Sequence, residues 1–324
     1  MNDYLMCVRA VNGDTFEAEV GDCRFLVIPP GQLPSPRHAI QADTWYKAVL
    51  REAVWKNEEG EPRGDILFVV HGYNNSTGEV IERHRILRDD LQAIGFKGVI
   101  VSFDWPSDNK ALAYLPDRHR AKISALTLVA SGIRYLSAEQ TPSCTINIHV
   151  LGHSTGAYVI RQAFHDADDT SLPNGSWSVS QVVFAAGDIS SKSMAGTDGE
   201  SGSLYRHSIR VTNYFSRHDD ALDLSNVKRL GLAPRVGRIG LPDDAPQCAV
   251  DVDCTEYYEL LIGDASQILA PDQLHGFFGK KSHSWYFGNR MFTYDLFCVL
   301  IGKDRKVIPS RTIGKDGKFR LIHF

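Results

Sequence analysis

Two kinds of hydrophobic pattern alternate along the chain and predict its secondary structure. Uninterrupted apolar runs, typical of strands buried on both faces of a parallel sheet, occupy residues 65–70, 98–103, 145–151, 181–186 and 209–215. Apolar side chains at helical spacing occupy residues 79–94, 117–139, 157–166 and 291–301. Strands that alternate with helices predict an α/β fold with a mostly parallel, doubly wound sheet and helices on both faces.

The first residues of the chain have a different pattern. Residues 4–28 alternate apolar and polar positions around Asn12-Gly13-Asp14 and Gly21-Asp22, which are hairpin signals. A helix follows, and Asp43 is its predicted N-terminal cap. We therefore expect edge strands and a covering helix.

These patterns predict three segments. Residues 1–60 form the edge strands and covering helix, packed on the main domain. Residues 61–303 form that domain. Residues 304–324 form a C-terminal tail with a hairpin signal at Asp316-Gly317.

Composition narrows the class of protein. Of 324 residues, 43% are hydrophobic and 23% are charged, as in ordinary globular proteins. The formal net charge of −4 gives no basic footprint for nucleic acid or anionic lipid. The absence of an apolar run of membrane-spanning length argues against integral membrane association.

The cysteines bear on the compartment. Six are scattered along the chain, at positions 7, 23, 144, 248, 254 and 298. Without a secretory signal at the N-terminus, they are typical of free thiols in a reducing compartment. Cys248 and Cys254 lack a matching His/Cys pair, so we do not expect a metal site there. We predict a cytoplasmic protein.

The strongest chemical signal is Gly152-His153-Ser154-Thr155-Gly156. It follows the apolar run 145–151 and precedes the helical stretch 157–166. A strand, G-x-S-x-G and a helix in this order are the context of a nucleophile elbow, which exposes the serine hydroxyl above the sheet. The alternative is an ordinary Gly/Ser turn. Ser154 is thus the candidate nucleophile.

A second loop could stabilise an oxyanion. The run 65–70 ends in His71-Gly72-Tyr73, and a glycine here lets backbone N–H groups turn toward developing negative charge. The candidate donors are the amides of Tyr73 and Thr155. We interpret His71 as a buried residue that shapes the loop, and not as the base.

The serine needs a base, and the base needs an orienting acid. In α/β hydrolases these follow the serine in the order acid, then histidine. Asp219 and His283 satisfy this order, and each comes just after a predicted regular element. His283 would move the proton and Asp219 would orient the imidazole.

Alternatives remain open for both partners. Asp188 follows the preceding predicted strand, and Asp220 and Asp223 are neighbours of Asp219. His275 is a second late histidine and competes with His283 for the role of base.

Neighbouring residues define the rest of the predicted site. Gly72, His153, Trp105 and Trp285 are candidates for substrate binding, and a pocket lined by Tyr73, Trp105 and Trp285 would suit an apolar or aromatic group. Residues 190–203 are rich in serine and glycine, so we expect a mobile loop beside the site. No P-loop, dinucleotide fingerprint or H-E-x-x-H pattern is present, so neither a cofactor nor a metal is predicted.

Several of these segments together resemble a known family. They are residues 68–74, the Trp105-Pro106-Ser107 segment with Tyr114 and Asp117, residues 152–156, residues 185–188, residues 216–222, and His283. In this combination, over roughly residues 60–300, the chain is similar to the bacterial α/β-hydrolase family DUF900, a domain of unknown function.

The resemblance implies the α/β-hydrolase fold. The family pattern S-x-x-D-x-A-L falls on residues 216–222 and implies that Asp219 is the acid, and the late histidine of the family falls on His283. Two positions depart from the pattern. Gly187 stands where the family often has proline, and Asp104 precedes Trp105 where a small residue is usual.

Two functional hypotheses follow. The first is a serine hydrolase that cleaves an ester, thioester or lipid-like acyl bond of a small molecule through an acyl-enzyme. The second is a non-catalytic binding or scaffold module on the same fold. The fold is compatible with both, because a fold does not imply a function.

Overall fold

A single sheet runs through the part of the chain described by the computed structural model, which covers residues 1–107, 114–139, 145–170, 177–227, 233–263, 272 and 281–324. The sheet has twelve described strands. They are β1 (Asp3–Asn12), β2 (Thr15–Ile28), β3 (Ala39–Ile40), β4 (Val54–Lys56), β5 (Pro62–Val70), β6 (Val99–Asp104), β7 (Thr145–His153), β8 (Val179–Ala185), β9 (Ser208–Phe215), β10 (Ala249–Asp253), β11 (Arg311–Ile313) and β12 (Phe319–Leu321).

The spatial order of the strands shows the expected crossovers. It is β11-β12-β10-β9-β8-β7-β5-β6-β1-β2-β3, and β4 pairs with β5 outside this path. All neighbours from β12 to β1 in this order pair in parallel. The remaining pairs, including the two edge hairpins, are antiparallel. The predicted mostly parallel sheet is confirmed.

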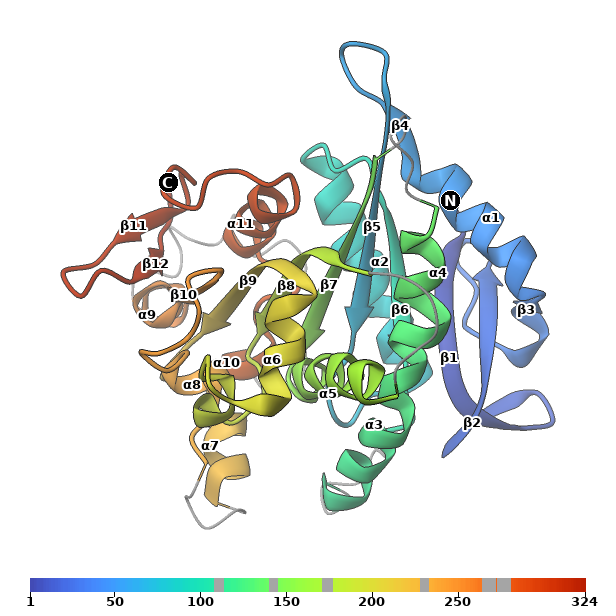
Figure 1. The fold of residues 1–324 in the computed structure, drawn as a ribbon, viewed down its shortest axis with the longest axis horizontal. Coiled ribbons are helices and arrows are strands. Elements are labelled where there is room, and N and C mark those ends of the chain that lie inside the picture. Colours follow the sequence, from blue (N-terminus) through green and yellow to red (C-terminus); the bar gives the residue numbers. More distant parts are fainter. Residues whose placement is uncertain (108–113, 140–144, 171–176, 228–232, 264–271, 273–280) are drawn as a thin grey trace.

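Helices cover both faces of this sheet, as Figure 1 shows. The longer ones are α1 (Ala42–Ala53), α2 (Thr77–Ala93), α3 (Tyr114–Leu128), α5 (Thr155–Asp169), α6 (Gly199–Arg206), α7 (Asp220–Val227), α9 (Thr255–Ile262) and α11 (Arg290–Leu300). The shorter ones are η1 (Pro36–His38), the π-helical turn η2 (Val129–Ile133), α4 (Arg134–Ser137), η3 (Ser191–Met194), α8 (Val236–Ile239) and α10 (Lys281–Ser284). None of the described helices is both long enough and apolar enough to span a bilayer. The cytoplasmic location stays a prediction.

The alternation of side chains along β5 explains the two layers. Ile66, Phe68 and Val70 enter one buried cluster together with residues of α1, α3 and α5. Leu67 and Val69 enter the other cluster, with residues of α2, α9 and α11. Successive side chains of a strand point to opposite faces, so an unbroken apolar run needs helices on both sides.

The N-terminal residues extend the same sheet. The turn at Gly13 joins β1 and β2 as predicted, and β1 pairs in parallel with β6. The hairpin expected at Gly21-Asp22 is wrong, because β2 continues through both residues. The β1–β2 register shifts near Arg9, and a Cβ on Gly21 would lie 2.6 Å from Ala10 Cα; this glycine permits a bulge. Asp43 lies in the first turn of α1, whose N-cap is Gln41.

The loop expected over residues 190–203 is also wrong, because this segment forms η3 and the start of α6. Asp198 caps α6 through the amides of Glu200 and Ser201. The hydroxyl of Ser203 donates to the Phe164 carbonyl oxygen at 2.6 Å. A serine-rich segment can thus form a packed element when its hydroxyls donate to buried carbonyl oxygens. Composition alone does not reveal such bonds.

The C-terminal hairpin of β11 and β12 is anchored by a buried charge. Asp295 on α11 is fully buried and accepts hydrogen bonds from Arg311 Nε at 2.9 Å and from Tyr214 Oη at 2.5 Å. The hydroxyl of Ser310 donates to Asp295 Oδ2, the oxygen that also accepts from Arg311 Nε, at 2.7 Å. Removal of the carboxylate would leave the Arg311 guanidinium buried and unpaired.

We therefore expect Asp295→Ala to lower the free energy of unfolding by about 3–5 kcal/mol, measured by urea denaturation. The control is Asp89→Ala, because Asp89 is an exposed carboxylate paired with Arg88, and exposed pairs contribute little. Equal stability of the two variants would contradict this account.

Candidate functional site

Ser154 lies at the junction of β7 and α5 in a strained backbone conformation. Its φ is 56° and its ψ is −125°, a region that residues with a Cβ rarely adopt. Its N–H donates to the Ala185 carbonyl oxygen at 3.1 Å, and its carbonyl oxygen accepts from the Asp188 N–H at 2.9 Å. These contacts with the last residue of β8 and with the segment after it hold the turn, and the side chain makes no capping bond to α5.

Backbone strain gathers at this edge of the sheet. In the described part of the chain, the non-glycine residues with positive φ are Asn74, Ser154 and Ala186. They follow β5, β7 and β8, neighbouring parallel strands whose carboxyl ends meet at one edge. Such strain is retained where the surrounding structure over-determines it, and it concentrates at functional sites.

The glycines of the G-x-S-x-G motif are required by packing. A Cβ on Gly152 would lie 2.7 Å from Ala157 N, and one on Gly156 would lie 2.1 Å from the Val70 carbonyl oxygen. Both contacts are with backbone, which cannot move aside easily. The motif therefore allows α5 to pack closely against β5 and β7.

The loop after β5 contacts the serine through Gly72. A Cβ on Gly72 would lie 2.6 Å from Ser154 Cβ and 3.2 Å from Ser154 Oγ. Tyr73 follows directly and is partly exposed. The Thr155 N–H is the first amide of α5, where an N–H has no acceptor within the helix. Gly72, which precedes Tyr73, thus lies against Ser154, and Thr155 follows the serine directly.

His283 and Asp219 are in direct contact, although 64 residues separate them in sequence. Nδ1 of His283 lies 2.7 Å from Asp219 Oδ2. The other carboxylate oxygen of Asp219 accepts from the Leu222 N–H at 2.9 Å, and the residue is fully buried. With Nδ1 held by the carboxylate, Nε2 is the ring nitrogen of His283 that remains for proton transfer.

The alternative acids have other partners. Asp188 Oδ1 lies 3.0 Å from Arg235 Nε. Asp220 accepts from the hydroxyl of Ser282 at 3.2 Å, and Asp223 pairs with Arg238 at 3.3 Å. The alternative base, His275, lies outside the described residues.

His153 connects the elbow to the segment that carries His283. Its Nε2 donates to the His283 carbonyl oxygen at 2.9 Å, and the two rings are 4.8 Å apart. Its ring also packs against Phe287 at 5.2 Å. Burial, together with the charges of His283 and Arg83, lowers the pKa of His153 well below its usual value. Among the described residues, no hydrogen bond joins Ser154 Oγ to His283 directly. The connection runs through His153, which precedes Ser154 in the chain and whose side chain bonds to the His283 carbonyl oxygen.

The two tryptophans predicted to bind substrate are buried. Trp105 stacks on His71, with ring centroids 5.3 Å apart, and Trp285 packs against Tyr257, Tyr258 and Tyr286. At 0% and 1% exposure they offer almost no surface to a substrate in this conformation, and their role in binding stays a prediction.

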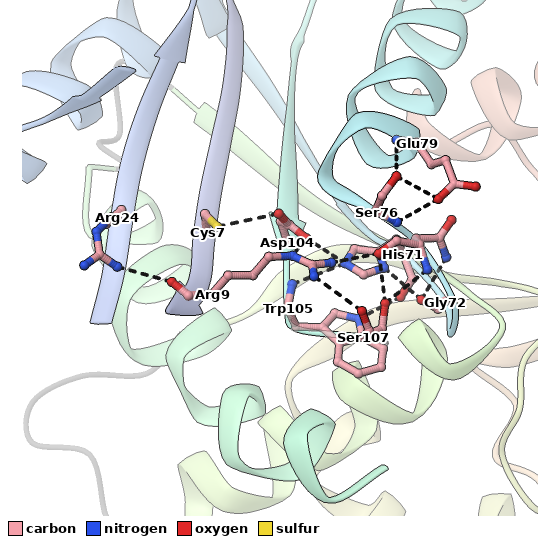
Figure 2. Close-up of polar contacts among 11 residues, drawn as sticks. Cys7, Arg9, Arg24, His71, Gly72, Ser76, Glu79, Asp104, Trp105 and Ser107 are labelled. Atoms are coloured by element: carbon pink, nitrogen blue, oxygen red, sulfur yellow. Dashed lines mark hydrogen bonds and ion pairs between the residues drawn. The ribbon is translucent and has the colours of Figure 1, made fainter. Parts of the chain in front are cut away.

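A buried polar network beneath the Gly72 loop contains residues that the sequence analysis missed. It joins Arg9, Asp104 and Asn75 to His71, and Figure 2 shows it between β1 and the loop. The signal for Asp104 was a charged residue at the end of an apolar strand. The signal for Arg9 was a long cationic side chain within an apolar-rich segment. Hydrophobic periodicity alone does not identify the partner of such a side chain.

Candidate metal ligands do not gather in the described residues, where no group of three or more His, Cys, Asp or Glu side chains could hold an ion. The five described cysteines, at positions 7, 23, 248, 254 and 298, are free thiols.

Comparison with known proteins places the chain in a family. Residues 46–271 match the model described as "Alpha/beta hydrolase of unknown function (DUF900)". The chain belongs to this family. It is thus a member of the α/β-hydrolase superfamily, as its sheet and elbow indicate. No curated protein matches the DUF900 chain.

Solved structures similar to this DUF900 protein include enzymes, all at low identity. Esterase B from Lactobacillus rhamnosis is 8% identical with a TM-score of 0.33; the match covers 58% of this chain and 65% of the esterase. Est1E from Butyrivibrio proteoclasticus is 12% identical with a TM-score of 0.36, covering 66% and 88%. The RedJ thioesterase of Streptomyces coelicolor is 11% identical with a TM-score of 0.32, covering 64% and 83%.

The packing of the elbow predicts the effect of a methyl group. Gly156→Ala places a Cβ against the Val70 carbonyl oxygen, so we expect a loss of about 1–3 kcal/mol or more in the free energy of unfolding. Gly199→Ala is the matched control, since a Cβ there meets nothing within 4 Å. Equal unfolding midpoints in urea would refute the packing argument.

The buried His153 predicts a pH dependence of stability. Its pKa is lowered in the folded protein, so its contribution is complete above the unfolded value of 6.5 and is lost as the pH falls. In His153→Gln the free energy of unfolding should decline less steeply below this pH, by up to about 1.4 kcal/mol per pH unit. Urea denaturation across about pH 5 to 8 measures both slopes. Identical slopes would show that His153 titrates normally.

Proposed function

We propose that the protein is a serine hydrolase that cleaves an ester, thioester or lipid-like acyl bond of a small molecule. Ser154 is the nucleophile, His283 the general base and Asp219 the orienting acid. The observation that supports this most is the 2.7 Å contact between His283 Nδ1 and the buried carboxylate of Asp219. The strained turn of Ser154, typical of a nucleophile elbow, and the hydrogen bond from the neighbouring His153 to the His283 backbone also support the proposal.

Acylation follows from these positions. Ser154 Oγ attacks the acyl carbon while His283 Nε2 takes the hydroxyl proton, and a tetrahedral oxyanion forms. The bond to the leaving group then breaks, and the imidazolium returns the proton to the departing alkoxide or thiolate. Asp219 stabilises the imidazolium and holds its tautomer, because the carboxylate faces Nδ1.

Deacylation repeats the sequence with water. His283 takes a proton from a water molecule, the hydroxide attacks the acyl-enzyme carbonyl, and the carboxylic acid leaves as Ser154 Oγ recovers its proton. In both steps the negative charge develops on the former carbonyl oxygen. The backbone amides of Tyr73 and Thr155 are the proposed donors to that oxygen, since preorganised donors stabilise the transition state more than the substrate.

Labelling with a fluorophosphonate and hydrolysis of an activated p-nitrophenyl ester test the proposal. Wild-type protein should be labelled and active. Ser154→Ala should lose labelling, and His283→Ala should lose labelling and turnover together. Asp219→Asn should keep the fold but lower kcat by about three to four orders of magnitude, because the amide no longer favours the required tautomer.

Asp223→Asn is the matched control, because Asp223 is a nearby half-exposed carboxylate paired with Arg238, and it should retain wild-type rates. Folded wild-type protein that is neither labelled nor faster than Ser154→Ala would reject the enzyme and favour the non-catalytic binding module.

A further inference from the structure

We propose that Arg9 and Asp104 are positioning residues that orient the Tyr73 amide through a buried network, and that the strand β1 thereby completes the active site. This inference rests on the proposed function, since it concerns the oxyanion donors of that reaction. Neither residue reaches the reacting atoms itself. Both act through the loop of residues 71–75.

The carbonyl group of Gly72 sets the direction of the Tyr73 N–H. The two groups belong to one planar trans peptide, so they point in opposite directions. The Gly72 oxygen accepts from His71 Nδ1 at 2.8 Å and from Asn75 Nδ2 at 2.9 Å. These donors hold the oxygen on the network side, and the Tyr73 N–H must therefore point to the opposite side of the peptide.

Asp104 holds the first of these donors. Its Oδ1 lies 3.1 Å from His71 Nε2, which the Trp105 N–H also approaches at 3.2 Å, and the other ring nitrogen, Nδ1, lies 2.8 Å from the Gly72 carbonyl oxygen. The ring also stacks on Trp105, with an angle of 7° between the planes. The orientation of His71 is thus fixed by contacts on its edge and its face.

Arg9, on the neighbouring strand β1, connects the two donors, His71 and Asn75, to each other. It reaches His71 through Asp104 and contacts Asn75 directly. Its Nε donates to Asp104 Oδ1 at 2.8 Å, and its Nη2 donates to the Asn75 carbonyl oxygen at 2.8 Å. The hydroxyl of Ser107 closes the group by donating to the same Asn75 oxygen at 3.1 Å. Figure 2 shows the Arg9 side chain extending from β1 to Asp104 and His71.

The electrostatics make Arg9 necessary. Burial alone would raise the pKa of Asp104, but the charges of Arg9 and His71 lower it to about 2, so the carboxyl group is ionised. Without Arg9 a fully buried carboxylate would lose its only fixed cation among the described residues. An uncompensated buried charge is costly, and the local structure would rearrange around Asp104 and His71.

Arg9 lies outside the segment of the chain that matches the family model. The family match begins at residue 46, and β1 spans Asp3–Asn12. A strand outside the matched segment therefore supplies the cation of the network. The catalytic unit of this protein includes its N-terminal hairpin.

Steady-state hydrolysis of a small p-nitrophenyl ester by the full-length chain tests this inference. Arg9→Met should lower kcat by about 10- to 100-fold with KM changed less than about twofold, because a displaced oxyanion donor weakens the transition state and not the bound substrate. Arg37→Met is the control, since Arg37 is an exposed arginine of the N-terminal segment that pairs with Asp14. It should match wild type.

Chemical rescue separates positioning from a general loss of structure. In Arg9→Ala, millimolar guanidinium chloride, far below denaturing concentrations, should restore part of the lost kcat and leave Ser154→Ala inactive. A folded Arg9→Met with wild-type kcat and KM would overturn the inference. So would a loss of activity that guanidinium does not restore in a folded Arg9→Ala.

Should both variants fail to fold, Arg9→Lys decides. A single ammonium keeps the charge beside Asp104 but cannot reproduce the two-sided contact with Asp104 and Asn75, so kcat should fall several-fold at constant KM. Wild-type kinetics would overturn the inference. An inactive, unlabelled wild type would instead reject the proposed function, and the inference with it, whereas an active wild type with insensitive Arg9 variants rejects only the inference.

Discussion

The backbone of Ser154 is held in a conformation that it would not adopt alone, and the site depends on the sheet that holds it there. Hydrogen bonds from β8 and the segment after it fix both sides of the turn, and Gly156 lets α5 pack against β5 without a clash. Strain of this kind persists only when neighbouring elements over-determine the geometry. The parallel strands are therefore both the core of the fold and the support that presents the serine.

The contacts around the serine come from segments far apart in the sequence. His153, next to the serine, bonds to the backbone of His283, and the ring of His283 bonds to Asp219 at the start of α7. The neutral state of the buried His153 suits this position, because a second cation beside His283 would oppose the imidazolium formed in the proposed reaction. Packing of the C-terminal segment against the elbow thus brings Asp219, His283 and Ser154 to one edge of the sheet.

Two of the buried ion pairs join a peripheral strand to the main body. Asp295 anchors Arg311 of β11, and Asp104 binds Arg9 of β1. A buried ion pair is a weak source of stability in itself, since desolvation offsets much of the attraction. Its geometry, however, is specific. At Arg9 that specificity is transmitted through Asn75 and His71 to a single peptide of the proposed oxyanion loop.

The sequence by itself determined the apolar strands β5 to β9 and the helices α1, α2, α3, α5 and α11, because hydrophobic periodicity is a local property of the chain. Motif spacing in the same way singled out Ser154, Asp219 and His283 as candidates. Prediction failed where local composition misled: the serine-rich residues 190–203 are ordered by bonds to distant carbonyls, and Gly21 permits a bulge and not a turn. Only the tertiary structure decided that Asp219, and not Asp188, contacts His283, and that Arg9 reaches Asp104. These are long-range pairings, and which of several similar carboxylates meets a given histidine depends on how the elements pack in three dimensions.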